Sequence, residues 1–185
     1  DFCPQTLFLY GTYKENGEPN FGLFCWFSYC WMDGLGVMAA IGGSKLTLDR
    51  IRETKVFSAN LVTEQLLPLA DHLGSVSGYE AEKMAAPAAW EKGAVLPVPV
   101  LTDSPVAFEL EVQRFVPLDD ADNVVLLCKV RNVLLDEGLQ NDTLSVEERL
   151  RAIAPVRTTC ETYFSWDGRA MGGWHEPGQV YNHLA

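Results

Sequence analysis

The 185-residue chain carries 25 Asp and Glu residues against 14 Lys and Arg residues, and its formal net charge is −11. Nucleic acids need a basic face to bind their phosphates, so this balance excludes them as expected partners. With 48% hydrophobic and 21% charged residues the composition is that of a globular protein. No run of about eighteen apolar residues occurs, and we therefore expect no membrane span.

The cysteines and histidines predict neither a disulfide framework nor a metal site. The five cysteines are scattered without a C-x-x-C pair, and the three histidines lack the spacing of zinc ligands. Cys25 and Cys30 are an odd number of positions apart, which would point them to opposite faces of a strand. A chain of this length can build its core without disulfides. We expect a reducing, cytoplasmic setting.

The first half of the chain predicts a hairpin, further strands and two short helices. The expected strands are residues 6–12, 21–27, 36–41 and 56–62, and the expected helices are residues 46–53 and 64–72. In the fourth strand apolar residues alternate with Ser58 and Asn60, which predicts one solvent-facing side. Residues 74–90 read as a long polar loop, and loops of that length are usually functional or mobile.

The second half returns to strands. Residues 106–116 alternate apolar side chains with Glu109 and other polar ones, which predicts a one-sided strand. Residues 124–135 predict a long curved strand and 158–164 a last one, while Ser145 and Glu148 form a capping box that opens a helix to about residue 152. The tail, 168–185, reads as irregular. Without a repeat or a dividing linker, we expect one mainly β domain over residues 1–185, with a few short peripheral helices.

Two motifs that suggest other enzymes fail on their context. Residues 34–39 match G-x-G-x-x-A, but Gly42 and Gly43 leave no length for the helix that a dinucleotide fold needs, so we expect a strand there. Residues 74–78 resemble a hydrolase elbow without being G-x-S-x-G, and His72 nearby is weak support for a nucleophile and base. We therefore expect a flexible loop and no catalytic residue.

Residues 42–47 predict an anion site. They combine glycine backbone, the hydroxyls of Ser44 and Thr47, the ammonium of Lys45 and the start of a helix. Free N–H groups and the helix dipole attract anions at such a turn. The alternative is a plain helix cap, in which Ser44 or Thr47 bonds a backbone N–H and Lys45 lies in solvent.

The order of the segments around this turn resembles the FMN-binding split barrel of flavin reductases and flavoredoxins. The likeness covers roughly residues 5–165. The matching segments are the turn 17–20, the aromatic strand 24–28, the S-x-x-T turn 44–47, the helix end 51–54, the F-x-x-N strand 57–60, the loop 74–83 and the strand 105–111. Cys25, Trp26 and Arg50 stand where many relatives have small hydroxyl residues or asparagine, and Gly34-Leu35 replaces two prolines.

The resemblance implies a mainly β fold, a split β-barrel, with FMN as cofactor. It implies that Ser44, Lys45 and Thr47 hold the FMN phosphate and that the isoalloxazine ring lies against the strand of Cys25, Trp26, Phe27 and Ser28. Asn60 and Lys83 match positions near the flavin. Members of the family are typically homodimers with the flavin near the interface, where Trp174 would contribute unless it is a packing residue.

The function implied is an oxidoreductase that passes electrons from NADH, NADPH or a reduced partner protein through FMN. A flavin performs hydride and one-electron chemistry itself, so no catalytic side-chain cluster is needed. The departures at Cys25, Trp26 and Arg50 fit a flavoredoxin-like member at least as well as a dedicated flavin reductase. Three alternatives stay open: a non-enzymatic FMN carrier or electron-transfer protein, a pyridoxamine phosphate oxidase-like relative, and a β-barrel interaction module without flavin.

Overall fold

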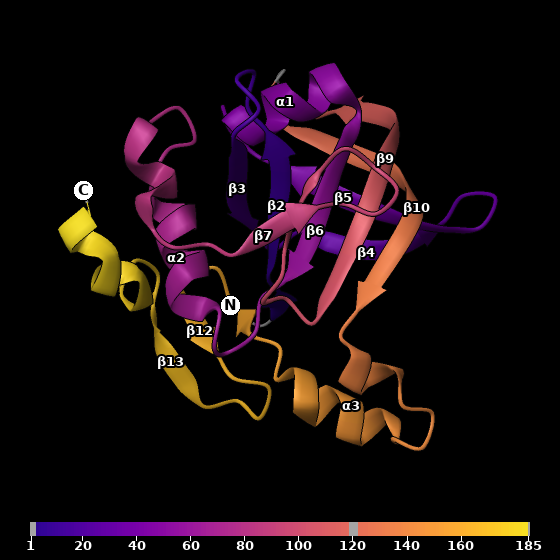
Figure 1. The fold of residues 1–185 in the computed structure, drawn as a ribbon, viewed down its shortest axis with the longest axis vertical. Helices are drawn as coiled ribbons and strands as arrows, with labels where there is room; N and C mark the ends of the chain where they lie inside the picture. Colours follow the sequence, from indigo (N-terminus) through magenta and orange to yellow (C-terminus); the bar gives the residue numbers. More distant parts are fainter. Residues whose placement is uncertain (1–2, 119–121, 185) are drawn as a thin grey trace.

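The main element of the fold is a seven-stranded antiparallel sheet. The computed structural model describes residues 3–118 and 122–184. In spatial order the strands are β3 (Pro19–Phe24), β2 (Phe8–Tyr13), β6 (Val56–Leu61), β9 (Val106–Pro117), β10 (Val124–Leu135), β5 (Leu35–Ile41) and β4 (Phe27–Trp31). The curved sheet forms the body of the molecule (Figure 1), and the predicted mainly β class is confirmed.

The sheet curls because β3 and β4 lie at its opposite ends although only Cys25 and Trp26 separate them in the chain. At this crossing Trp26 O accepts a hydrogen bond from Ala40 N, at 2.9 Å, and the rings of Phe8 and Phe27 stack at 4.1 Å. The prediction of one strand over residues 21–27 is therefore wrong. Hydrophobicity is continuous through the crossing, so it gives no sign that the backbone changes edges there.

The barrel interior holds the largest apolar cluster. Tyr10, Phe57 and Phe108 are buried in it, and α1 (Leu46–Thr54) packs Leu48 and Ile51 onto it. Figure 1 shows α1 at one end of the barrel. The helix predicted at residues 46–53, with these two residues on its buried face, is confirmed.

Polar residues expected on a solvent face are buried instead. Ser58 Oγ donates to Pro99 O at 2.5 Å, and Asn60 Oδ1 accepts from Leu101 N at 2.9 Å. Glu109 accepts backbone N–H groups from residues 94–96. This face is covered by the small sheet of β7 (Trp90–Lys92) and β8 (Pro99–Leu101), a long-range contact that strand alternation cannot predict. Burial alone would raise the pKa of Glu109, but the hydrogen bonds from Asn132 and from this backbone outweigh it and lower the pKa.

A second, four-stranded sheet and a C-terminal helix extend the fold. The sheet has the order β1 (Gln5–Thr6), β11 (Arg157–Thr158), β12 (Thr162–Phe164) and β13 (Ala170–Gly173). The 3-10 helix η3 (Pro177–Leu184) lies beside α2 (Leu67–Ser75) (Figure 1). Two predictions are thus wrong: residues 158–164 form a hairpin that turns at Cys160, with φ 69°, and the tail is ordered from Ala170 to Leu184. The tail's last position, Ala185, is outside the described residues.

The remaining elements follow the predictions more closely. α2 begins and ends three residues later than expected. The segment 74–90, which we expected to be a loop, contains the end of α2 and the 3-10 helix η1 (Ala81–Ala85). After η2 (Glu137–Gln140), α3 (Val146–Ile153) begins with the predicted capping box of Ser145 and Glu148. Gly34–Ala39 lies in a turn and β5, as expected of a chain without the dinucleotide fold. In the described part of the chain no helix has the length and apolarity to cross a membrane.

Candidate functional site

A cavity of about 230 Å³ lies beside the start of α1, and we call it the α1 cavity. Three segments meet there: the end of β3, the turn into α1, and the end of α2 with the loop after it. Its lining residues are Gly22–Phe24, Ser44–Thr47, Leu73–Gly78 and Lys83. The anion turn predicted from the sequence therefore lines a partly open cavity, with Ser44 and Lys45 exposed and Thr47 buried.

The N-terminus of α1 is not capped by a side chain. Lys45 is the N-cap residue, with extended backbone, and neither Ser44 nor Thr47 makes the cap hydrogen bond. The first N–H groups of a helix have no partner within it, so a ligand in the cavity can take them. The plain helix cap, the alternative for this turn, does not occur.

Thr47 presents its hydroxyl as a donor. Asn20 Nδ2 donates to Thr47 Oγ1 at 3.0 Å and to Thr12 Oγ1 at 3.3 Å, and both Asn20 and Thr47 are buried. Thr47 Oγ1 accepts this hydrogen bond and donates to no described residue, so its proton is available to a ligand. Within the described residues, Asn20 Oδ1 has no partner. Asn20 is a site residue that we did not predict beyond its place in the turn 17–20.

Lys83 is the most unusual group of the α1 cavity, because its side chain is only 4% exposed. Among the described residues, none forms an ion pair with it. Burial is the largest cause that lowers the pKa of Lys83, and together with the positive charges of Lys14 and Lys45, and against the opposing charge of Glu80, it brings this pKa to about 8. A buried cation without a counterion is costly, so this site favours an anionic ligand.

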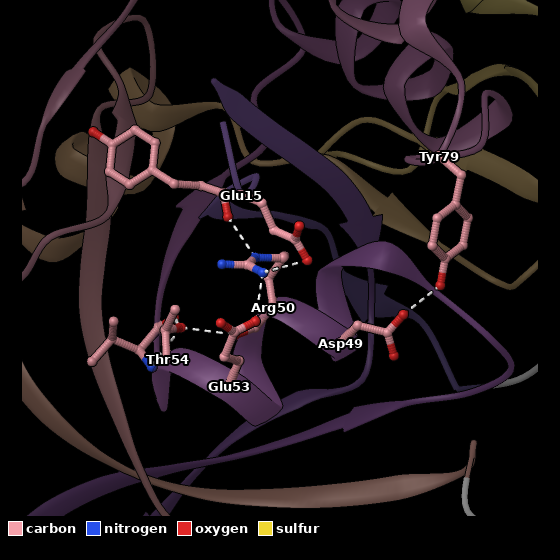
Figure 2. A network of polar contacts seen from close by, with 8 residues as sticks. Glu15, Asp49, Arg50, Glu53, Thr54 and Tyr79 are labelled. Atoms are coloured by element: carbon pink, nitrogen blue, oxygen red, sulfur yellow. Dashed lines mark hydrogen bonds and ion pairs between the residues drawn. The ribbon is translucent and has the colours of Figure 1, made fainter. Parts of the chain in front are cut away.

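Further side chains of α1 are tied to their surroundings, as Figure 2 shows. Arg50 donates from Nε to Tyr13 O at 2.9 Å and from Nη1 to Glu53 at 2.5 Å. Tyr79, from the loop after α2, donates to Asp49 at 2.6 Å. Arg50 is not among the residues that line the α1 cavity, and its hydrogen bonds hold the helix to Tyr13.

A second cavity of about 150 Å³ adjoins the first, and we call it the Trp174 cavity. The two share Leu23, Phe24, Gly74 and Ser75. Its other walls are Leu7, Cys25, Asp71, Tyr163, Trp174 and His175. Burial, together with the neighbouring Cys160 thiol, raises the pKa of Cys25 to about 12, so this thiol stays protonated and contributes a mostly apolar wall.

The structure brings five of the nine predicted site residues to these cavities. Ser44, Lys45, Thr47 and Lys83 line the α1 cavity, and Cys25 lines the Trp174 cavity. Trp26 packs beside Gly42, with a ring atom 3.3 Å from where a Cβ would stand on that glycine. Ser28 is exposed on β4.

Phe27 and Asn60 lie away from both cavities. Phe27 stacks on Phe8 at the barrel core, and Asn60 donates to Leu9 O at 2.9 Å while its oxygen accepts from Leu101 N. Sequence reasoning did not find Tyr163, Asp71 or His175 as site residues. These residues come from segments far apart in the chain, and no local motif marks them.

Comparison with known proteins places these cavities in context. The profile of the flavin reductase like domain family matches residues 1–154. Flavoredoxin of Desulfovibrio vulgaris (Miyazaki F) has a TM-score of 0.76 at 22% identity, over 88% of this chain and 86% of that chain. An FMN-binding protein from Thermus thermophilus, with bound p-hydroxybenzaldehyde, has a TM-score of 0.66 at 25% identity, over 76% and 77%.

A third solved structure, a proposed flavin reductase with a split barrel domain from Shewanella frigidimarina, has a TM-score of 0.75 at 14% identity, over 88% of this chain and 82% of that chain. A search of curated proteins found no match. The predicted family resemblance and the predicted split barrel are confirmed by these comparisons.

Proposed function

Since the chain belongs to the flavin reductase like domain family, we propose that it binds FMN and passes electrons from a reduced nicotinamide or a reduced partner protein through that flavin. The observation that supports FMN is Lys83, a buried cation without a counterion among the described residues, in a cavity also lined by Lys45. FMN ends in a phosphate monoester, which is an anion of the size and charge that such a turn binds.

In this proposal the FMN phosphate lies in the α1 cavity. Lys45 and Lys83 supply positive charge, Ser44 and Thr47 supply hydroxyl donors, and the uncapped N-terminus of α1 supplies backbone N–H groups. Thr47 is already oriented, because Asn20 occupies its acceptor side. The groups therefore match a phosphate without any rearrangement of their hydrogen bonds.

The isoalloxazine ring is proposed to lie along the crossing from β3 to β4, against Cys25 and Trp26, with Ser28 following on β4. This crossing continues from the shared wall of the two cavities. Phe27 and Asn60 support the barrel beneath it, since their side chains point into the protein. We further propose that residues 1–185 act as one flavin-binding domain.

The flavin, when bound, supplies the hydride and one-electron chemistry, and the residues of the chain bind it, orient it and exclude water. An FMN-binding electron-transfer protein is a second candidate, favoured by the likeness to the FMN-binding protein from Thermus thermophilus. Anaerobic mixing with NADH and NADPH separates the two. Bleaching of the flavin absorbance indicates a reductase, and its persistence indicates a carrier.

The phosphate assignment predicts that Lys45→Ala weakens FMN binding about tenfold. A charge-assisted hydrogen bond contributes about 1.5–3 kcal/mol, and the effect lies at the low end because Lys45 is exposed. Riboflavin lacks the phosphate, so its binding should be nearly unchanged. Thr47→Val should act in the same direction. The measurement is the ratio of FMN to riboflavin affinity from flavin fluorescence. Lys92→Ala, on the exposed strand β7, is the control. If the ratio of FMN to riboflavin affinity is the same in Lys45→Ala as in the unsubstituted protein, the phosphate assignment is wrong. If both affinities fall together, the substitution has damaged the barrel in general.

We also propose a homodimer. The β4–β5 hairpin projects from the barrel (Figure 1) and exposes Tyr29 by 59%, Trp31 by 82% and Leu35 by 49%. Apolar surface of this kind, gathered on one hairpin, is typical of an interface. Light scattering at micromolar concentration with FMN present should give the mass of a dimer, and Trp31→Glu should shift it towards the monomer. A monomer in the unsubstituted protein would refute the proposal.

A further inference from the structure

A hydrogen bond joins two residues that no motif connects. Ser75, the last residue of α2, and His175, in the turn after β13, bring Oγ and Nδ1 to 2.5 Å. Both residues line the Trp174 cavity. The contact therefore places an imidazole in the wall of the cavity next to the proposed phosphate site.

The hydrogen bonds of Ser75 fix the tautomer of His175. Ser75 Oγ lies 2.7 Å from Asp71 O, and a carbonyl oxygen can only accept, so the single hydroxyl proton of Ser75 is donated there. Ser75 Oγ must then accept from His175, whose Nδ1 carries the proton. In the neutral imidazole this leaves Nε2 unprotonated, as a hydrogen-bond acceptor. No described residue bonds to this nitrogen.

The backbone of His175 is held as firmly as its ring. Its φ of 67° lies in the left-handed region, which few residues other than glycine adopt, although histidine, like asparagine and aspartate, is enriched there. Its N–H donates to Asp71 Oδ1 at 2.9 Å, and the same buried carboxylate accepts from Tyr163 Oη and Gly178 N. The hydrogen bond to Asp71 therefore fixes the backbone at His175, as the contact with Ser75 fixes its ring.

The same geometry excludes a hydrolytic triad. In such a triad the carboxylate bonds the imidazole ring, and the imidazole accepts the serine proton. Here Asp71 bonds the backbone N–H of His175, and the proton of Ser75 goes to a carbonyl. Ser75 therefore orients His175 and is not activated as a nucleophile.

We propose that His175 Nε2 accepts a hydrogen bond from an amide-type N–H on a planar ring in the Trp174 cavity. The cavity has aromatic walls from Phe24, Tyr163 and Trp174, and its volume of about 150 Å³ is that of a site for a single ring. The inference rests on the proposed function, which offers two such groups: the imide of the isoalloxazine and the carboxamide of a dihydronicotinamide. His175 is thus a ligand-contacting residue, and Ser75 is its positioning residue.

The test uses His175→Asn. Asparagine tolerates the left-handed backbone and its amide can still donate to Ser75, but it is too short to replace Nε2. Lumiflavin, which has the ring without the phosphate chain, and 3-methyllumiflavin, which lacks the imide N–H, are titrated by fluorescence. The Michaelis constant for NADH is measured with saturating FMN. His183→Asn, on the exposed side of η3, is the matched control.

Two results support the inference and distinguish its sources. If the imide ring of the isoalloxazine occupies the cavity, His175→Asn weakens lumiflavin binding roughly three- to tenfold and leaves 3-methyllumiflavin unaffected. If the dihydronicotinamide does, lumiflavin affinity stays constant while KM for NADH rises by a similar factor at unchanged kcat. Ser75→Ala should reproduce either effect more weakly, because the imidazole then loses its fixed tautomer.

The contrary results are equally distinct. If flavin binding depends on Lys45 but neither lumiflavin affinity nor KM responds to His175→Asn by more than twofold, the role of His175 is overturned and the proposed function stands. If the unsubstituted protein binds no flavin at all, the proposed function fails, and the inference about His175 fails with it.

Discussion

Lys83→Met is expected to weaken FMN binding about a hundredfold at pH 7 and to change riboflavin affinity by less than threefold. Lys83 is buried in the α1 cavity, so its charge interacts with a bound phosphate with little screening by water. Methionine has a similar length and no charge, and it can fill the same space. The loss should exceed that of Lys45→Ala, because Lys45 is exposed.

The pH dependence of FMN binding provides an independent test of the proposed role of Lys83. The pKa of Lys83 is lowered from 10.5 to about 8, so the folded protein without ligand releases this proton before the unfolded chain does. Between these values the unfolded state binds more protons, and the free energy of unfolding therefore rises with pH. A bound phosphate favours the ammonium form and raises the pKa. FMN affinity should consequently fall as the pH passes 8, while riboflavin affinity should not.

Titrations of FMN and riboflavin between pH 7 and pH 10 test both the loss of FMN affinity in Lys83→Met and the fall of FMN affinity above pH 8. Lys83→Met should remove the part of the FMN pH dependence that begins near pH 8. Lys92→Met, on the exposed strand β7, should leave affinity and pH profile unchanged. Equal losses of FMN and riboflavin affinity in Lys83→Met would show that Lys83 supports the fold and does not contact the phosphate.

Local chemistry made part of this site predictable. A Gly-Gly-Ser-Lys turn followed by an amphipathic helix specifies both α1 and the direction of its free N–H groups, and these depend only on neighbouring residues. The capping box of α3 is local in the same sense. That the α1 cavity binds a phosphate stays a prediction. The burial of Lys83 supports it, and this burial is visible only in the structure and not in the sequence.

The features that sequence reasoning missed depend on contacts between distant segments. Glu109 alternates with apolar neighbours as a solvent-facing residue would, and only the return of residues 94–96 over it creates its buried site. Ser75 and His175 are 100 positions apart. The end of β3 reads as continuous with β4, because closing a barrel changes the strand's partners and not its hydrophobicity.

The C-terminal segment also depends on contacts with a distant part of the chain, those with Asp71. These contacts lead to the second prediction with a large expected effect. Asp71→Ala is expected to lower the free energy of unfolding by about 3 kcal/mol or more, because a buried donor left without its acceptor costs about 1–3 kcal/mol. Three donors depend on this carboxylate: Tyr163 Oη at 2.7 Å, His175 N at 2.9 Å and Gly178 N at 2.7 Å. Burial and the hydrogen bond to Asp71 raise the pKa of Tyr163, so its hydroxyl stays protonated and remains a donor.

Asp71→Ala should also loosen the wall of the Trp174 cavity, because the segment from β13 to η3 carries Trp174 and His175. Urea denaturation measures the stability, and hydrogen exchange at Gly178 reports the release of the segment. Asp136→Ala, which removes one exposed cap to Gly138 N, should cost about 1 kcal/mol and is the control. If the isoalloxazine occupies the Trp174 cavity, lumiflavin affinity should also fall in Asp71→Ala, while the ratio of FMN to riboflavin affinity should keep its dependence on Lys45. If Gly178 exchange and stability match those of the unsubstituted protein, Asp71 does not anchor this segment, and the support we assign to His175 is wrong.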